Sequence, residues 1–327
     1  MAFIGLDLIA LKNYRSNKRK PALHLAARTY SLVGFTIIFN LCILSISNGQ
    51  HILHGFNADT LNKGAYLGQG PPDLVPKVYA PGLISGQGRL HSFVSFSSDL
   101  KTMLWGRIPP QIFIMRSTDS IWSQPKVATF SINGNNQSPF HAPGNKVFFA
   151  SNRKGGKGSM DIWYACFDGS NFKCPRNLGN EINSEGLETH PTISDFQTLY
   201  FTGTVKGKMY ERGIYCSEYS GGSYKKPQLL PYPINIVNPK TIDYTPFIAA
   251  DESYLLFCSN RQNPGLELCH IYISYRSQDG SWGEPVNINQ KMDFMDSSKF
   301  PYVTPDMKYL FFCSGENIYW VDAHILF

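Results

Sequence analysis

Several motifs that would point to a metal or a cofactor are missing from this sequence of 327 residues. The seven cysteines include no Cys-x-x-Cys pair and the eight histidines are scattered, which argues against a zinc site. The glycine-rich residues 155–159 resemble a phosphate loop, but they lie in an expected β-hairpin and do not open a helix. We therefore expect no metal and no cofactor.

A basic surface is also missing once the N-terminus is set aside. The formal net charge is +6, from 30 lysines and arginines and 24 acidic residues. Residues 1–49 contribute six basic residues and one acid, so the remaining chain carries a net charge of only +1. Without a basic field there is no argument for a nucleic-acid partner.

The N-terminal 49 residues have the pattern of an export signal. A basic segment precedes the apolar run 32–44, and small residues such as Ser47 and Gly49 follow it. The run is short for a membrane span, which favours cleavage near Gly49. The basic segment is unusually long, so an uncleaved signal anchor, the one expected contact with a membrane, is the alternative. We expect a periplasmic, outer-envelope or secreted protein, with residues 1–49 as the signal and residues 50–77 as a lead-in along the surface.

A strand-and-turn repeat fills residues 78–327. Each copy has a proline or its equivalent, an apolar pair, a turn that usually carries an Asp, and an apolar strand. The aligned proline positions are Phe93, Pro139, Pro191, Pro246 and Pro301. Their spacings of 46, 52, 55 and 55 residues are typical of propeller blades, in which each unit must stack on its neighbours to bury its apolar face.

The end of the repeat predicts how the ring closes. The last copy stops after its third strand at Phe327, whereas residues 78–85 resemble the outer, fourth strands of the other copies. Placing residues 78–85 in the last blade removes the exposed edges of an open array. We therefore predict an all-β, five-bladed β-propeller closed by an N-terminal strand, with six blades as the alternative if residues 50–80 add strands.

The repeat resembles the WD40-like β-propeller repeat of the TolB type over about residues 78–323. The residues that carry the likeness are the Pro…Asp…Leu-Tyr-Phe strand pairs, Ser151-Asn152-Arg153, Asp161-Ile162-Trp163, Ser259-Asn260-Arg261 and Trp282-Gly283-Glu284-Pro285. The resemblance implies an exported bacterial protein that serves as an interaction module, without shared catalytic residues. The TolB propeller has six blades, so its specific partners are not carried over. We interpret Asn152, Arg153, Asp161, Asn260 and Arg261 as structural residues of the repeat.

Candidate site residues stand three positions before each aligned proline. These positions hold Leu90, Asn136, Glu188, Asp243 and Ser298. Because first strands line the axis of a propeller, we expect the four polar residues to form a binding site at one channel mouth. The predicted function is a non-catalytic scaffold that binds a protein or a glycan.

An alternative function is a carbohydrate-active hydrolase that uses Glu188 and Asp243, because glycosidic cleavage needs a pair of carboxylates. The other interpretation of Glu188 and Asp243 is structural. In that case their carboxylates bond to neighbouring blades or to solvent.

Six cysteines follow the signal segment. Cys166 and Cys174 flank a hairpin turn, and Cys258 and Cys269 flank a loop in the same manner. In an oxidising compartment either pair is a candidate disulfide, Cys166–Cys174 first. Alternatively, Cys258 and Cys313, which share one repeat position, are small buried apolar residues.

Overall fold

The computed structural model describes residues 63–88, 90–204, 212–236 and 238–327. The chain divides into two units, Met1–Ile52 and Leu53–Phe327, and every described residue belongs to the second. The expected signal segment lies outside the described residues. In the part of the chain that is described, no helix has the length and apolar character needed to span a membrane.

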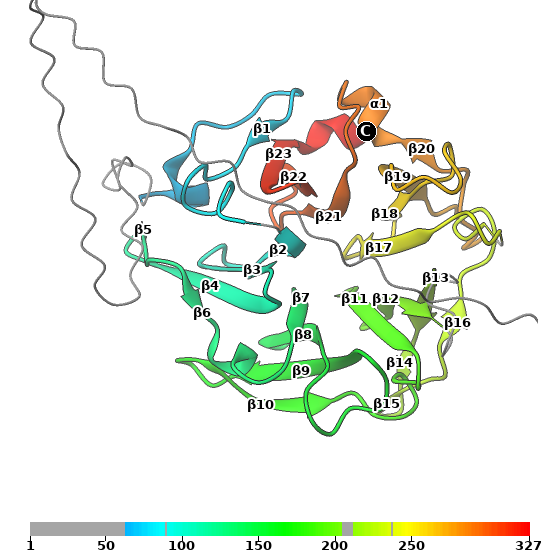
Figure 1. The fold of residues 1–327 in the computed structure, drawn as a ribbon, viewed down its shortest axis with the longest axis horizontal. Helices are drawn as coiled ribbons and strands as arrows, with labels where there is room; N and C mark the ends of the chain where they lie inside the picture. Colours follow the sequence, from blue (N-terminus) through cyan, green and yellow to red (C-terminus); the bar gives the residue numbers. More distant parts are fainter. Residues whose placement is uncertain (1–62, 89, 205–211, 237) are drawn as a thin grey trace, which may run out of the picture. The chain divides into compact units, whose positions relative to one another are not determined.

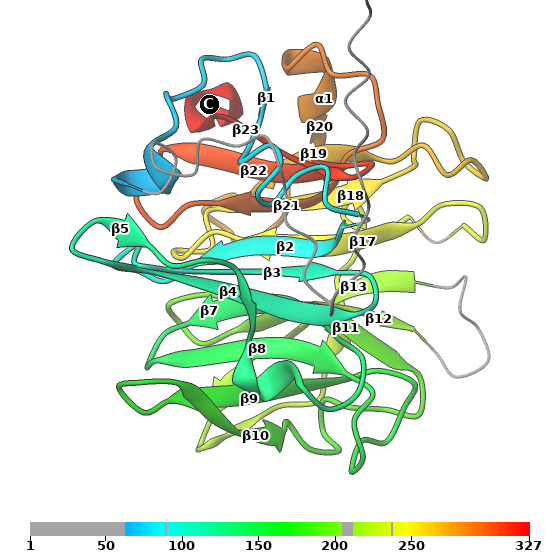
Figure 2. The ribbon, with the colours of Figure 1, turned by 60° about the vertical axis from the view of Figure 1, so that its left-hand side comes forward.

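Five antiparallel sheets form a ring, which confirms the five-bladed propeller (Figure 1). The innermost strand of each blade faces the axis, and the other strands follow outward (Figure 1); Figure 2 shows the same ring turned by 60°. Blade 1 holds β2 (Leu90–Phe96), β3 (Thr102–Arg107) and β4 (Gln111–Thr118), edged by β5 (Ile121–Trp122) and β6 (Lys126–Val127). Blade 2 holds β7 (Asn136–Ala142), β8 (Lys146–Ser151), β9 (Asp161–Phe167) and β10 (Phe172–Asn177). Blade 3 holds β11 (Leu187–Ile193), β12 (Leu199–Thr204), β13 (Arg212–Ser217) and β16 (Gln228–Leu229), beside the hairpin β14 (Tyr219–Ser220) and β15 (Ser223–Tyr224). Blade 4 holds β17 (Asp243–Ile248), β18 (Tyr254–Ser259), β19 (His270–Tyr275) and β20 (Val286–Asn287). Blade 5 holds β21 (Lys299–Val303), β22 (Tyr309–Ser314), β23 (Asn317–Asp322) and β1 (Lys77–Val78).

The described helices are the short α1 (Ile288–Lys291), η1 (Ala65–Gly68), η2 (Thr129–Ser131) and η3 (Ala323–Leu326).

The predicted closure by an N-terminal strand is confirmed. Strand β1 pairs antiparallel with β23, with Lys77 opposite Trp320. The N–H of Tyr79 continues the pairing with a 2.8 Å hydrogen bond to the carbonyl of Ile318. The first strand of the described chain thus covers the outer edge of the last blade, and no blade is left with three strands.

The lead-in does not merely follow the surface, as the sequence suggested. Tyr66 and Leu67 are buried, and both adopt left-handed backbone angles, with φ of 52° and 63°. The Tyr66 ring packs edge-on against Phe96 of blade 1 and Tyr309 of blade 5. Its hydroxyl donates a 2.7 Å hydrogen bond to Asp306. The lead-in therefore joins the first and last blades, because aromatic partners from both are available to bury it.

A β-bulge interrupts the innermost strand at each repeated proline. In β7, β11, β17 and β21 the pairing register shifts at the proline. The residue before the proline has a positive φ in all four strands: Ser138, His190, Thr245 and Phe300 lie between 51° and 60°. Proline has no N–H for the strand ladder, so a bulge is the arrangement that admits it. The repeated proline thus marks a fixed bend in the wall of the axis.

The connections between blades are fixed by a short polar side chain that follows a buried apolar one. Asn183 accepts a 2.8 Å hydrogen bond from the N–H of Ile162 in β9 and donates one of 3.0 Å to its carbonyl. Asn235 does the same to Ile214 in β13. The corresponding pairs are Ile84-Ser85, Phe130-Ser131, Ile182-Asn183, Ile234-Asn235 and Ile288-Asn289. This second repeat was missed in the sequence, although Ile-Asn stands at this position in three of the five junctions.

The cysteines of the propeller are free thiols in the structure. Cys166 lies opposite Lys173 across the β9–β10 ladder, whereas Cys174 lies in an irregular stretch of β10 with a φ of 52°. Both are exposed. Cys258 and Cys269 are buried, and Cys258 lies opposite Ile271, not Cys269.

Thiol labelling is expected to separate these cysteines. In a Cys42→Ser background, Cys166 and Cys174 should react rapidly with a thiol-reactive disulfide reagent. Cys258 should react only on unfolding, because burial shields it and raises the pKa of its thiol to about 12. Cys166→Ser and Cys174→Ser should each remove one fast thiol. If fast thiols emerge only after reduction, the two cysteines form the disulfide that the sequence suggested.

Candidate functional site

Aromatic side chains fill the axis of the ring in two layers. Phe140, Phe247 and Tyr302 form one layer, with ring centroids 5.4 to 6.4 Å apart. Phe93, His190 and Phe300 form the other, with centroids 5.4 to 6.0 Å apart. The three rings of each layer come from three different blades, so they meet at the axis. The layers separate two ends of the ring: the turn side, where innermost strands turn into second strands, and the start side, where innermost strands begin.

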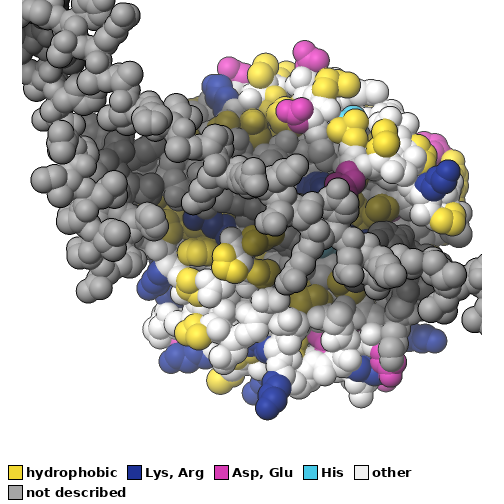
Figure 3. All heavy atoms as spheres, in the orientation of Figure 1, with side chains coloured by type: hydrophobic (Ala, Val, Ile, Leu, Met, Phe, Trp, Pro, Cys, Tyr) yellow, Lys and Arg dark blue, Asp and Glu magenta, His cyan; other side chains and the backbone are white. Residues whose placement is uncertain are grey.

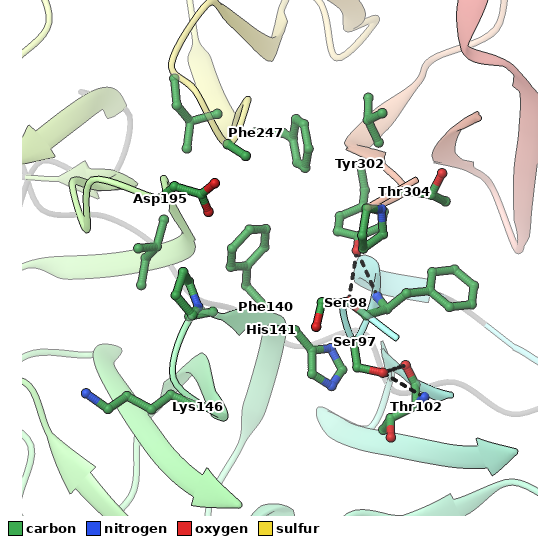
Figure 4. Close-up of a pocket in the computed structure, with 18 of the residues that line it drawn as sticks. Ser97, Ser98, Thr102, Phe140, His141, Lys146, Asp195, Phe247, Tyr302 and Thr304 are labelled. Carbon is green, nitrogen blue, oxygen red and sulfur yellow. Dashed lines mark hydrogen bonds between the residues drawn. The ribbon is translucent and has the colours of Figure 1, made fainter. Parts of the chain in front are cut away.

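A cavity of about 500 Å³ lies on the turn side, above the first of these layers. Phe140, Phe247 and Tyr302 line it, as Figure 4 shows, and all five blades contribute walls. The walls are mainly the turns between first and second strands, at residues 97–99, 142–146, 249–250 and 303–305, together with Ile193, Asp195 and Met307. This volume lies in the range of sites that hold small ligands, and the mix of aromatic floor and polar rim is typical of such sites.

The polar groups of the cavity are acids, hydroxyls, a neutral histidine, the Asn145 amide and the Lys146 ammonium. Burial opposes the ionisation of Asp99, but hydrogen bonds from the Ser97 hydroxyl and the Lys101 N–H outweigh it and lower the pKa of the carboxyl. Burial lowers the pKa of the His141 imidazole to about 3, so the ring is uncharged at neutral pH. The Ser95 hydroxyl accepts from the His141 backbone N–H at 2.8 Å and lies 3.1 Å from the ring Nδ1. Asp195 extends the acidic lining from blade 3.

The candidate residues Asn136 and Asp243 lie on the start side, and both are bound by arginines. The Arg261 guanidinium lies 2.8 Å from the Asp243 carboxylate. Arg153 donates a 2.6 Å hydrogen bond to the Asn136 side chain at the equivalent place in blade 2. Each guanidinium also donates to a backbone carbonyl of the preceding connection and to the serine two residues before it. The arginines stack over aromatic rings as well, Arg261 at 4.9 Å from the Phe257 centroid.

The other residues of the Ser-Asn-Arg repeat act on backbone groups. Asn152 and Asn260 accept hydrogen bonds of 2.7 and 2.8 Å from the N–H groups of Asn135 and Ile242, which directly precede the innermost strands. The buried Asp161 carboxylate accepts from the N–H groups of Lys157 and Gly158 at 2.7 and 2.8 Å. These contacts fix loops on the start side.

Ser298 and Glu188 have different surroundings. Ser298 is buried and accepts a 2.7 Å hydrogen bond from Asn289. Glu188 lines a second cavity, of about 440 Å³, with Glu181, Glu185 and the Tyr215 ring. Asp243 is not among its lining residues. The four predicted binding residues thus share one end of the ring, but each is bonded to its own local partners.

Glu188 carries an unusual carboxyl group. Burial raises its pKa to about 7, although hydrogen bonds from the Ser184 N–H at 3.1 Å and hydroxyl at 2.5 Å oppose the shift. A raised pKa means that the native state binds more protons than the unfolded chain between about pH 4.5 and 7. The stabilising effect is therefore complete at low pH and is lost as the pH rises through about 7.

Glu188→Gln is expected to remove this pH dependence. The free energy of unfolding of the wild-type chain should fall by up to about 3 kcal/mol, relative to the variant, between about pH 4.5 and pH 7.5. Urea titrations at a series of pH values measure the difference. Glu218→Gln, at an exposed ion pair with Lys225, is the control and should leave the profile unchanged. Parallel profiles for wild type and Glu188→Gln would contradict the raised pKa.

On the face shown in Figure 3, the described side chains form no large patch of one charge. In the face shown in Figure 3, the described basic side chains are scattered among acidic, apolar and other polar groups.

Comparison with known proteins supports the fold. A scan against protein-family models finds no match, and a search of curated proteins finds none either. Among solved structures, a thermostable family-43 glycoside hydrolase matches with a TM-score of 0.52 and 14% identity, over 74% of this chain and 90% of the hydrolase. TolB from Acinetobacter baumannii matches with a TM-score of 0.45 and 14% identity, over 73% of this chain and 55% of TolB. At 14% identity, the match to the glycoside hydrolase supports the propeller fold and no particular activity.

Proposed function

We propose that this protein is a non-catalytic propeller scaffold of the bacterial cell envelope that binds a partner at its turn side. The observation that carries the proposal is the turn-side cavity of about 500 Å³, lined by all five blades and closed below by three aromatic rings. The resemblance of the repeat to the WD40-like repeat and the signal-like pattern of the N-terminal sequence support an exported interaction module. On the start side, Arg153 and Arg261 already bond to the candidate residues Asn136 and Asp243. These contacts favour the turn side as the place where a partner binds.

A steric block tests the location of the binding site. Ala250 is exposed and lines the cavity, so Ala250→Trp fills space there without removing a side-chain contact. The chain is screened against a glycan array and a displayed-peptide library, and turnover of each hit is followed. We expect Ala250→Trp to weaken binding at least about tenfold, whereas Gln124→Trp, on the outer edge of blade 1, leaves it unchanged. Equal binding by both variants would refute the turn-side site.

A carbohydrate-active hydrolase is the second candidate, supported by the Glu188 cavity. A carboxyl group with a pKa of about 7 suits a general acid, and aromatic walls suit a sugar. The second carboxylate would come from Glu181 or Glu185, which share this cavity, and not from Asp243. Release of reducing sugar that Glu188→Gln abolishes, and Glu218→Gln does not, would establish this activity. Binding without turnover supports the scaffold.

A further inference from the structure

We propose that the ligand of the turn-side cavity is a neutral oligosaccharide. This inference rests on the proposed function, because it names the ligand class of the same site. Three features of the mouth of this cavity, formed by the turns that line it, support a neutral oligosaccharide. They are its aromatic surfaces, its side-chain acceptors and hydroxyls, and the pairing of its backbone groups.

Aromatic rings are available both in the cavity and beside it. Phe140, Phe247 and Tyr302 form the floor in edge-to-face pairs. Phe196, at the tip of the blade 3 turn next to Asp195, is 68% exposed. A ligand that packs on Phe196 as well as on the cavity floor would remove this apolar area from water. The C–H faces of sugar rings are the apolar surfaces that pack on such side chains.

The polar groups of the mouth match hydroxyl groups. Asp99 and Asp195 are carboxylates that only accept hydrogen bonds, and the Ser98 hydroxyl can both donate and accept. Figure 4 places Asp195 and the Ser97–Ser98 turn on opposite sides of the aromatic floor. A sugar presents several hydroxyls around one ring, so it can donate to acids on both sides while its face packs on the floor.

The same groups argue against an anionic ligand. The lining carries two carboxylates against one lysine, Lys146, whose ammonium lies over the Tyr164 ring at 5.4 Å. His141, also in the lining, is neutral at physiological pH because burial lowers its pKa. A phosphate or a polyanion would meet net negative charge at this mouth.

The mouth of the cavity offers no unpaired strand edge to which an extended peptide could add as a further strand. The turns of the mouth satisfy their own backbone groups, at distances of 2.9 to 3.1 Å. The pairs are Ser97 N–H to Thr102 O, Ser194 N–H to Thr198 O, Ala249 N–H to Tyr254 O and Thr304 N–H to Tyr309 O. Recognition by strand addition needs an unpaired edge, and these turns present none. Side-chain recognition of a polyhydroxylated ligand is what this mouth provides.

Isothermal titration of the full chain with cello-, xylo-, malto- and arabinohexaose tests the proposal. We expect at least one hexasaccharide to bind, and the double variant Asp195→Ala/Phe196→Ala to weaken binding at least about tenfold. The matched control is Leu266→Ala/Glu267→Ala, which removes an adjacent exposed apolar and acidic pair from the start side. Both variants should unfold at the temperature of the wild type, since all four side chains are exposed.

Each other result overturns a defined part of the proposal. If no hexasaccharide binds, but displayed peptides bind and the Asp195→Ala/Phe196→Ala variant abolishes their binding, the ligand class is wrong and the turn-side site stands. If a hexasaccharide binds equally to both variants, its site lies elsewhere and the turn-side assignment fails. If neither ligand class binds, the inference and the proposed function both fail.

Discussion

Arg261→Ala is expected to lower the free energy of unfolding by about 3–5 kcal/mol, the cost of leaving a buried charge without its partner. The Asp243 carboxylate is 2% exposed and the Arg261 side chain 11% exposed. The guanidinium also donates to the carbonyl of Ile234 and to the Ser259 hydroxyl. It donates a third hydrogen bond to the Pro233 carbonyl, so the alanine variant loses the ion pair, three further hydrogen bonds and the stack on Phe257. Urea unfolding followed by far-UV circular dichroism measures the loss.

The blades themselves supply the matched control. Blade 2 has Asn136 where blade 4 has Asp243, and Arg153 binds it in the same way. Asp243→Asn keeps an oxygen that accepts from Arg261 but loses the acceptor of the Ile236 N–H at 2.8 Å, so it should cost about 1–3 kcal/mol, less than Arg261→Ala. If Asp243→Asn proves as destabilising as Arg261→Ala, the charge pair and not the shared hydrogen-bond geometry holds this junction.

Tyr79→Ala is expected to cost about 3–5 kcal/mol by opening the junction between the last and first blades. The Tyr79 ring is fully buried, edge-on to Phe311 and Trp320 at 4.9 and 5.3 Å. Its hydroxyl lies 3.8 Å from the sulfur of Met103 in blade 1. Deleting the ring leaves a cavity where this one side chain, directly after β1, contacts both the last and the first blade. Thermal unfolding should show one transition at a lower temperature.

Tyr79→Phe is the control for this variant. It keeps the ring and loses only a weak hydrogen bond to sulfur, so a loss below about 1 kcal/mol is expected. A small effect of Tyr79→Ala would mean that ring closure depends on the two-residue β1 ladder and not on this side chain.

The sequence was most informative where the same physical constraint recurs in each blade. The prolines at 139, 191, 246 and 301 recur because a bulge is needed at the same depth of each blade, and their spacing predicted the blade count. The closure of the ring by an N-terminal strand was predicted because the last copy of the repeat lacks a fourth strand. Burial of Tyr66 was not predicted, because its partners Phe96 and Tyr309 are distant in the sequence and no local pattern connects them.

The turn-side cavity escaped sequence analysis for the opposite reason. Its wall residues differ from blade to blade at one repeat position, as Ser97, Pro143, Asp195, Ala250 and Pro305 show, so aligning the repeats treats them as ordinary turns. The predicted site residues were chosen for a shared alignment column. Positions that are equivalent in every blade carry the structural bonds of the ring, and the residues that differ are free to form a particular site.

The two aromatic layers across the axis separate the turn side of the ring from the start side. A molecule held at the turn side and another held at the start side are separated by six rings, so neither has to leave for the other to bind. A scaffold with two such faces can tether one partner and raise the effective concentration of the second beside it, even when each contact alone is weak. Cooperation between the faces would then be a matter of proximity, with no signal passing through the ring.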